Sequence, residues 1–416
     1  MGRTLRTLSI LLSLLVPVHS TRSPDCGGIL TPLGLSYFAE VSKPHAETVL
    51  RQDLLAPAVP DLLVGSTKPS RTQINSVKVT ELSLSLVPDS GLRLMLGLEV
   101  TRLSIRADLH VEMNPEGNLE VVTSACKPTM EEVQSTEERE RSILWFSLLW
   151  DLVSKLLLSP NEELISLTAQ FPVSPSCQLQ YLPLAAPVFS EQGITISLQT
   201  TFQVAGMAIP LPVSPVPFNM PELASSSPAH LTLAFSEHFF SSLFFALEMA
   251  GAFNMTILSP LTTATVAPKI TQMGSLFPED LPVVLQAVFR SSTRVVLEEG
   301  KAALKLLLTV HVGAGSPAFQ SFLSVNVDMS AGLLLSVTNT RMIISAPDAL
   351  LEELFLPTIR TEVPAQINVV LSEGVVLPHI SSFTYTNINV VIHKDYVLVP
   401  CNLQLQERTG AQTTVG

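Results

Sequence analysis

The most constraining feature of this sequence is Leu103–Met113, a segment in which apolar and polar residues alternate strictly. Alternation with a period of two predicts a β-strand with one buried and one solvated face. Residues 114–118 (NPEGN) are typical of a turn, and Leu82, Leu84 and Leu86 alternate in the same way before a second turn, PDSG. The first half of the chain is therefore expected to form long antiparallel strands joined by short turns.

A helix is expected before these strands, over residues 31–55. Thr31 is a good N-cap and Pro32 suits the first helical position. Pro44 is expected to kink or interrupt this helix. The apolar residues that recur at roughly helical spacing are Tyr37, Phe38, Val41, Val49 and Leu50.

A second, largely apolar helix is expected over residues 142–158, after the acidic run 131–140. An apolar helix of this kind must be wrapped by protein or lipid. The acidic run is interpreted as a solvated loop, with a binding segment for a cation or a basic partner as the alternative.

The second half of the chain repeats this order of elements. Ser236 is expected to cap a helix with a broad apolar stripe: Phe239, Phe240, Leu243, Phe244 and Leu247. An alternating strand, 304–312, follows the turn LEEGK, and a further helix is expected over 347–359. The chain then ends in a hairpin whose turn is 393–395. This repetition predicts an internal duplication.

Between the two halves lies a proline-rich strap, residues 209–221, with five prolines in thirteen residues. Proline cannot donate a ladder hydrogen bond, so the strap is expected to run extended along the body and to fix the angle between the halves. Residues 193–206, before the strap, are assigned to a central sheet. The predicted class is α+β, with two pseudo-symmetric antiparallel barrels wrapped around long helices. The chain is expected to divide into a signal peptide (1–20), an N-terminal barrel with central-sheet strands (21–205), a proline-rich linker (206–230), a C-terminal barrel (231–405) and a disordered tail (406–416).

The first twenty residues predict a secretory signal peptide, because Arg3 and Arg6 precede a short apolar run. The mature chain is expected to begin near Thr21, in an extracellular compartment. Removal of the signal leaves 22 basic and 36 acidic residues, a net charge of −14. Such a surface argues against nucleic acid and anionic membranes as partners, and no segment is long and apolar enough for a transmembrane helix.

The four cysteines, Cys26, Cys126, Cys177 and Cys401, are expected to form disulfides, with three connectivities open. Neither their spacing nor that of the histidines predicts a metal site. Asn254 begins the single N-glycosylation motif, Asn-Met-Thr.

No catalytic motif is found, and no cofactor is expected. The segment GAGS, 313–316, comes nearest to a nucleophile or phosphate loop, but a turn between two strands explains it better. The aromatic stripe that begins at Phe239 allows two interpretations, ordinary core or the wall of an apolar pocket.

Several segments carry a resemblance to a known family: PDCGGILTPLGLSYFAEVSKPHAE, TSACKPT, SCQLQYLPLAAPVFS, PVSPVPFNMPELAS and FTYTNINVVIHKDYVLVPC. The chain resembles the long, two-barrel members of the BPI/LBP/PLUNC family. The resemblance implies a boomerang of two barrels, each with an elongated pocket for a phospholipid-like chain. By this analogy helices 33–55 and 239–253 line the pockets, so the candidates are Leu33, Tyr37, Phe38, Val41, Val49, Leu50 and the five residues of the later stripe.

The sequence departs from the family pattern in two respects. The family disulfide joins the position of Cys126 to a cysteine in the next long helix, and this chain has none there. Cys126 is then expected to pair elsewhere, with Cys177 as one option, or to remain free. The chain is also short around residues 99–102 and 346–348, which leaves closure of both barrels open.

Two functions are therefore considered. The first is a secreted, non-enzymatic binder of phospholipid-like or other apolar molecules, in host defence, with bacterial lipids as weaker candidates on grounds of charge. The second is a structural or interaction protein of a secreted fluid, with vestigial pockets. The oligomeric state is left open.

Overall fold

The structure is a computed structural model of the 416-residue chain. It describes residues 23–54, 78–99, 103–130, 153, 155–157, 168–209, 218–222, 228–270, 276–277, 279–315, 318–347, 356–379 and 382–406. The predicted signal peptide and the acidic run 131–140 lie outside these residues. So do most of the predicted helix 142–158, the middle of the strap and the tail beyond Gln406.

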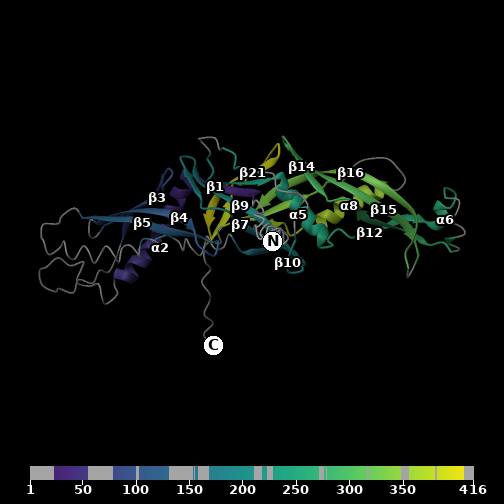
Figure 1. The fold of residues 1–416 in the computed structure, drawn as a ribbon, viewed down its shortest axis with the longest axis horizontal. Helices are drawn as coiled ribbons and strands as arrows, with labels where there is room; N and C mark the ends of the chain where they lie inside the picture. The colour runs from purple at the N-terminus through teal and green to yellow at the C-terminus, as the bar shows by residue number, and fades with distance from the viewer. Residues whose placement is uncertain are drawn as a thin grey trace, which may run out of the picture.

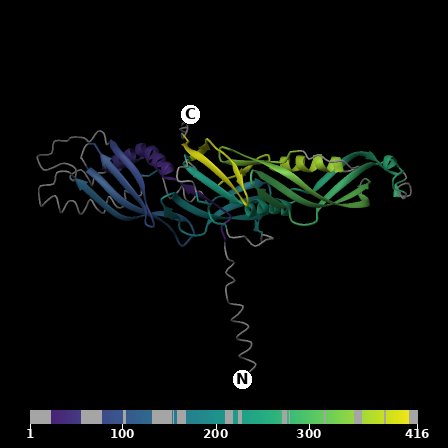
Figure 2. The same cartoon turned by 90° about the horizontal axis from the view of Figure 1, so that it is seen from above.

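The molecule is elongated, with a curled sheet at each end and a larger sheet between them (Figures 1 and 2). The helices are α2 (Pro32–Leu54), α5 (Glu237–Met249), α6 (Thr263–Val266) and α8 (Leu356–Val370). Figure 2 shows α2 beside the strands of one end and α8 beside the strands of the other. The fold is therefore mostly sheet, with few helices among the described residues.

The sheet of the N-terminal half is a four-stranded antiparallel meander. Its strands are β2 (Val79–Val87), β3 (Gly91–Leu98), β4 (Leu103–Met113) and β5 (Leu119–Met130). The alternation in Leu103–Met113 is confirmed as one strand, with Ile105, Ala107 and Leu109 no more than 1% exposed. The predicted turns are confirmed: Asn114 N–H donates to the Asn118 carbonyl, and Asp89 takes the positive φ of the other turn.

The sheet of the C-terminal half has seven strands. They are β12 (Met255–Thr262), β13 (Pro282–Phe289), β14 (Arg294–Glu298), β15 (Lys301–Ala314), β16 (Gln320–Thr338), β17 (Arg341–Ser345) and β18 (Val375–Val376). The alternating strand 304–312 lies inside β15, and GAGS begins the connection from β15 to β16, as expected. Ser236 caps α5 through a hydrogen bond from Phe239 N–H to Ser236 Oγ (3.2 Å).

The central sheet combines strands from both sides of the strap. Its order is β19 (Phe383–Thr386), β21 (Tyr396–Leu405), β11 (Leu231–Ser236), β1 (Cys26–Leu30), β9 (Gly193–Val204), β7 (Cys177–Pro183) and β6 (Gln170–Ser174), with three short strands beside this path: β8 (Val188–Ser190), β10 (Met207–Ala208) and β20 (Val391–His393). The two short strands that precede α2 and α5, β1 and β11, pair antiparallel at its centre. Each then pairs outward with a strand of its own half, β9 or β21. This arrangement supports the predicted duplication.

The described ends of the strap lie against this sheet. Ile209 N–H donates to the Phe202 carbonyl, and the rings of Phe218 and Tyr396 lie 6.5 Å apart. A Cβ atom on Gly27 would lie only 2.8 Å from Met220 Sδ, so the strap passes where β1 has no side chain. These contacts agree with an extended course along the body.

In each half, a glutamate of the opening helix caps a strand edge. Val79 N–H of β2 donates to Glu47 Oε1 of α2 (3.0 Å). On the other side of the molecule, Leu297 N–H of β14 donates to Glu237 Oε2 of α5 (2.9 Å). One helix turn along α5, Ser241 Oγ accepts from Val295 N–H (3.0 Å). These side chains satisfy backbone donors that an edge strand would otherwise leave open.

Three expectations need correction. Each half forms a curled half-barrel sheet, and not a closed barrel, in the described part of the chain, because the end strands do not pair with each other: β2 with β5 in one sheet, β12 with β18 in the other. Pro44 does not interrupt α2, since buried Ala39, Ala46 and Leu50 hold the turns on both sides of it. The predicted helix 347–359 is described only from Leu356, and it continues to Val370 through Pro364.

Candidate functional site

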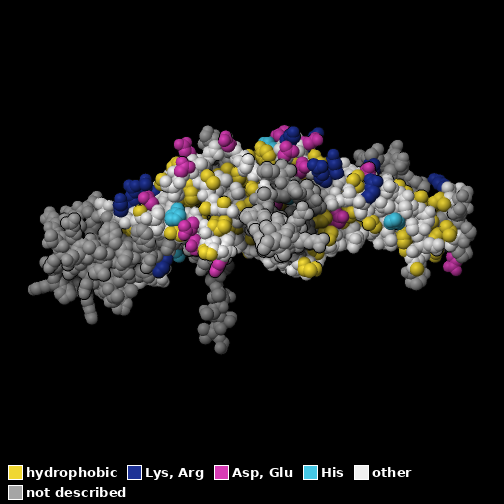
Figure 3. All heavy atoms as spheres, viewed as in Figure 1, with side chains coloured by type: hydrophobic (Ala, Val, Ile, Leu, Met, Phe, Trp, Pro, Cys, Tyr) yellow, Lys and Arg dark blue, Asp and Glu magenta, His cyan; other side chains and the backbone are white. Residues whose placement is uncertain are grey.

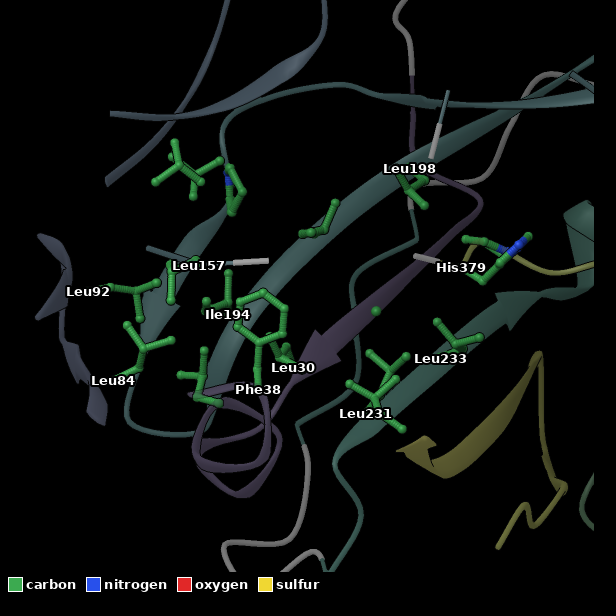
Figure 4. Close-up of a pocket in the computed structure, with 18 of the residues that line it drawn as sticks. Leu30, Phe38, Leu84, Leu92, Leu157, Ile194, Leu198, Leu231, Leu233 and His379 are labelled. Atoms are coloured by element: carbon green, nitrogen blue, oxygen red, sulfur yellow. The ribbon is translucent and has the colours of Figure 1, made fainter. Parts of the chain in front are cut away.

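An apolar cavity of about 150 Å³ lies between the central sheet and the N-terminal half (Figure 4). Helix α2 contributes Leu35 and Phe38, and the four strands of the N-terminal sheet each contribute one residue. The central sheet contributes most of the remaining wall. The residues that the central sheet contributes to the lining are Gly28, Leu30, Ile194, Ile196, Leu198, Leu231, Leu233, Tyr385 and Leu403.

The strand register explains why these side chains meet on one face. Gly28 of β1 stands opposite Ile196 of β9 and Leu233 of β11, and Leu30 stands opposite Ile194 and Leu231. Side chains in register point to the same face of a sheet. The lining crosses five neighbouring strands, from β9 to β19, a width of roughly 19 Å at about 4.8 Å per strand spacing.

The cavity wall is almost entirely hydrocarbon in the described part of the chain. Among the described residues that line it there is no Asp, Glu, Lys or Arg, and the two polar side chains are Tyr385 and His379. The Tyr385 hydroxyl donates to the Pro378 carbonyl, and His379 Nδ1 lies 3.0 Å from the Leu377 carbonyl. Both polar groups thus have a backbone carbonyl as a hydrogen-bond partner. The wall therefore suits an uncharged apolar molecule.

A buried polar cluster lies next to the cavity wall at Leu198. Next to Leu198, Cys26 Sγ lies 3.5 Å from Thr200 Oγ1. Asp25, 2% exposed, accepts hydrogen bonds at Oδ1 from Thr200 N–H (2.9 Å) and Thr200 Oγ1 (3.0 Å). Burial raises the pKa of this carboxyl to about 7, because desolvation outweighs the two hydrogen bonds.

The first turn of α2 holds Phe38 in place on the cavity wall. Thr31 Oγ1 donates to the Ala229 carbonyl (2.7 Å) and accepts from Gly34 N–H. The Tyr37 ring stacks on His230 at 4.8 Å, and its hydroxyl accepts from Leu405 N–H. Burial lowers the pKa of His230, which favours the neutral ring that accepts from Leu403 N–H. These contacts join α2 to the strands of the other half.

Of the eleven pocket candidates, the structure places Phe38 on the wall of this cavity. Leu33 is 48% exposed, Tyr37 and Val41 pack against the core of the central sheet, and Val49 and Leu50 belong to the N-terminal core. The five residues of the α5 stripe are each 0% exposed. Whether any of the eleven candidates, Phe38 included, contacts a ligand stays a prediction.

Sequence reasoning missed most of the cavity wall. Gly28, Leu231, Leu233, Tyr385 and Leu403 come from strands that are far apart in the sequence. A signal that could have found Leu231 and Leu233 is the segment LTLAF, which is mostly apolar and forms five of the six residues of β11.

The expectation of disulfides is wrong for this structure, in which all four cysteines are free and buried. Cys26 and Cys401 stand opposite Phe235 and Leu231 of the intervening strand β11. Four residues along the strand and two strand spacings separate them by roughly 16 Å, well beyond the reach of a disulfide. Burial raises the pKa of Cys177 to about 11 and of Cys401 to about 12, which makes both thiols unreactive.

Other candidate sites are limited. Asn254 is exposed at the start of β12, beside a groove that it shares with Glu362 and Gln366 of α8. Within the described ranges, no three His, Cys, Asp or Glu side chains are grouped so that they could hold a metal ion. Among the same residues, no helix has the length and apolar character needed to cross a membrane.

Comparison with known proteins places the chain in a family. No protein-family model matches it. Protein TENP of Gallus gallus is 60% identical over 437 aligned positions, which cover 96% of this chain and 99% of the relative. BPI fold-containing family B member 2 of Homo sapiens is 25% identical, over 96% of this chain and 98% of the relative. The crystal structure of lipopolysaccharide binding protein has a TM-score of 0.52 at 16% identity, and the match covers 92% of this chain and 100% of that chain.

Two curled sheets joined by a central sheet, with an apolar cavity beneath it, define a protein of the BPI-fold class. The chain belongs to the BPI/LBP/PLUNC family, in which Protein TENP of Gallus gallus is a near full-length relative. The alignment with that relative has more positions, 437, than this chain has residues, 416. The relative therefore has residues that this chain lacks, in keeping with the short regions noted in the sequence.

Proposed function

We propose that this protein is a secreted, non-enzymatic binder of phospholipid-like or other apolar molecules, with a role in innate host defence. The observation that carries the proposal is the hydrocarbon-lined cavity beneath the central sheet. Burial of apolar ligand surface there contributes about 0.8 kcal/mol per methylene group. The family supports the same reading, since one structural relative is a lipopolysaccharide binding protein.

The polar groups near the cavity favour a binding function over a catalytic one. Asp25 has the pKa that would suit a general base near pH 7, but its side chain is enclosed and bonded to Thr200. The nearby Cys26 thiol is fully buried, and burial raises its pKa well above the ordinary value. Neither group can meet a substrate without rearrangement of the central sheet.

Charge bears on which lipids are bound. The chain carries a net charge of −12 before removal of the predicted signal peptide, and −14 after it. Figure 3 shows basic and acidic side chains lying next to one another over the described part of the viewed face. We therefore expect lipopolysaccharide to bind weakly and to be released by added salt, because attraction through scattered charges is screened. Nanomolar binding that salt leaves unchanged would contradict this expectation.

Native mass spectrometry of protein purified from its source tests the proposal. We expect a co-purifying lipid, which solvent extraction removes and which incubation with phosphatidylcholine vesicles replaces. A cavity that remains empty after incubation with these vesicles and with single-chain alcohols would overturn the proposal.

The second candidate is a structural or interaction protein of a secreted fluid such as egg white, with a vestigial cavity. The observation that favours it is the volume of about 150 Å³, which lies below the roughly 300–1,000 Å³ typical of small-molecule pockets. An empty cavity in the experiment above is the outcome that this candidate predicts.

A further inference from the structure

Gly28 has a special position in the cavity. It lies in the middle of β1, between β9 and β11, and faces the cavity with no side chain. The residues before and after it on the same face of β1 are Cys26 and Leu30. Gly28 therefore leaves a gap in a face that is otherwise filled by larger side chains.

Gly28 lies between two groups of lining residues, because β1 pairs with β9 on one side and with β11 on the other. One group lies toward the N-terminal sheet, with Phe38 of α2 and Leu84 of β2. The other group lies toward the strands of the C-terminal half, with Leu233 of β11 and Tyr385 of β19. Figure 4 shows Leu84 and Phe38 on one side of the cavity, and Leu233 and His379 on the other.

A side chain at position 28 would fill the gap without a backbone clash. An added Cβ atom would lie 3.1 Å from Leu233 Cδ2 and 3.6 Å from Leu231 Cδ1, which are the ends of flexible side chains. The nearest backbone atom among these neighbours, the Thr232 carbonyl oxygen, is 3.7 Å away. A β-branched residue is well suited to a strand, so Gly28→Val should fold.

The aromatic face of α5 in the C-terminal half offers no comparable apolar space. Phe239, Phe240 and Phe244 of α5 are 0% exposed, so no water-sized void touches them. Their rings pack on one another and on Phe235 and Phe253, with centroids 4.9–6.5 Å apart. These side chains form a closed aromatic core, whereas the cavity enters the C-terminal half along the central sheet.

We propose that the cavity binds one single-chain, uncharged apolar ligand per protein molecule, laid over Gly28 across the boundary between the halves. This inference rests on the proposed function and specifies its ligand. A lining that spans roughly 19 Å around only about 150 Å³ makes the space narrow, which suits one hydrocarbon chain and not two side by side. A described lining without charged side chains suits an alcohol, or an acyl chain whose polar group stays outside.

The test measures affinity against chain length. Straight-chain alcohols of 8 to 16 carbons displace a fluorescent apolar probe from delipidated protein. In the natural protein we expect affinity to rise by up to about fourfold per added methylene, equivalent to about 0.8 kcal/mol, until the cavity is full. For the shortest alcohols, the affinity of Gly28→Val should lie within about twofold of that of the natural protein. For the longest alcohols, its affinity should be about 30-fold lower, because the valine side chain displaces two or three methylenes from the cavity.

Gly332→Val is the matched control. Gly332 lies in β16, and a Cβ atom there would have one neighbouring atom, 4.0 Å away. The affinity of this variant should equal that of the natural protein for alcohols of every chain length. Thermal unfolding checks that both variants are folded. Leu231→Phe, which narrows the same gap from β11, replaces Gly28→Val if the latter does not fold.

The outcomes separate the two levels of the argument. If the natural protein binds neither the probe, nor any alcohol, nor phosphatidylcholine, the proposed function itself fails. If it binds alcohols with a gain per methylene, but Gly28→Val and Leu231→Phe keep the same dependence on length, the ligand does not cross Gly28 and this inference is wrong. Two alcohol molecules bound per chain in native mass spectra would also overturn it.

Discussion

The buried carboxyl of Asp25 makes a quantitative prediction about stability. Its pKa is raised from 3.8 to about 7 by burial. A carboxyl whose pKa is higher in the folded state stabilises that state while it is protonated. The contribution is full below about pH 4 and is lost as pH rises to about 7. A shift of about three pKa units corresponds to about 4 kcal/mol of unfolding free energy.

The variant Asp25→Asn isolates this effect. Asparagine is neutral at every pH and keeps an Oδ1 acceptor for the two hydrogen bonds from Thr200. Denaturant unfolding at pH 4, 5, 6, 7 and 8 measures the free energy of both proteins. Relative to the variant, the natural protein should lose about 4 kcal/mol between pH 4 and pH 8, most of it before pH 7.

Asp395→Asn serves as the control for this experiment. Asp395 is exposed and has φ of 72°, a backbone conformation that asparagine tolerates well. Its unfolding free energy should follow that of the natural protein across the whole range. If the unfolding free energies of Asp25→Asn and of the natural protein change with pH in the same way, Asp25 is not a desolvated carboxyl and the reasoning fails.

Three further predictions concern packing and cysteine chemistry. Phe244→Ala should cost about 3–5 kcal/mol of unfolding free energy, because Phe244 is 0% exposed, whereas Leu33→Ala, at a 48% exposed position, should cost under about 0.5 kcal/mol; equal costs would refute the assignment of Phe244 to the core. Ser241→Ala should cost about 1–3 kcal/mol, because Val295 N–H loses its acceptor, while the exposed Ser336→Ala should be near neutral; no difference between the two would remove the edge-capping role of α5. All four thiols should react with a thiol reagent after unfolding without reductant, and almost none before unfolding; fewer than four reactive thiols in the unfolded chain would reveal a disulfide.

Features with a local physical signal could be predicted from the sequence. The alternation in β4, the turn NPEGN, the Ser236 cap and the final hairpin are each specified by residues close together in the chain. In the hairpin, Asp395 takes the positive φ that the tight turn requires. Such elements report the preference of a short segment, which tertiary packing here leaves unchanged.

The strand β1 at the middle of the central sheet carried no such signal. Strand β1 is five residues long, contains two glycines and is buried on both faces, so it has no period of two. It is a strand because β9 and β11, about 170 and 205 residues away, pair with it. The cavity has the same origin, since its wall combines residues from Gly28 to Leu403 that meet only when this sheet forms. Candidates chosen from helices alone could therefore recover Phe38, but not the wall of the sheet.

The most direct test of the whole account is a crystal structure of the protein purified from its source. We expect one continuous tube of electron density over Gly28, between α2 and the face of β1, β9 and β11. Continuation of this density beyond Gly28 toward Tyr385 would show that a single chain crosses both halves. An empty or water-filled cavity in well-ordered crystals, or density confined to α5, would contradict the account.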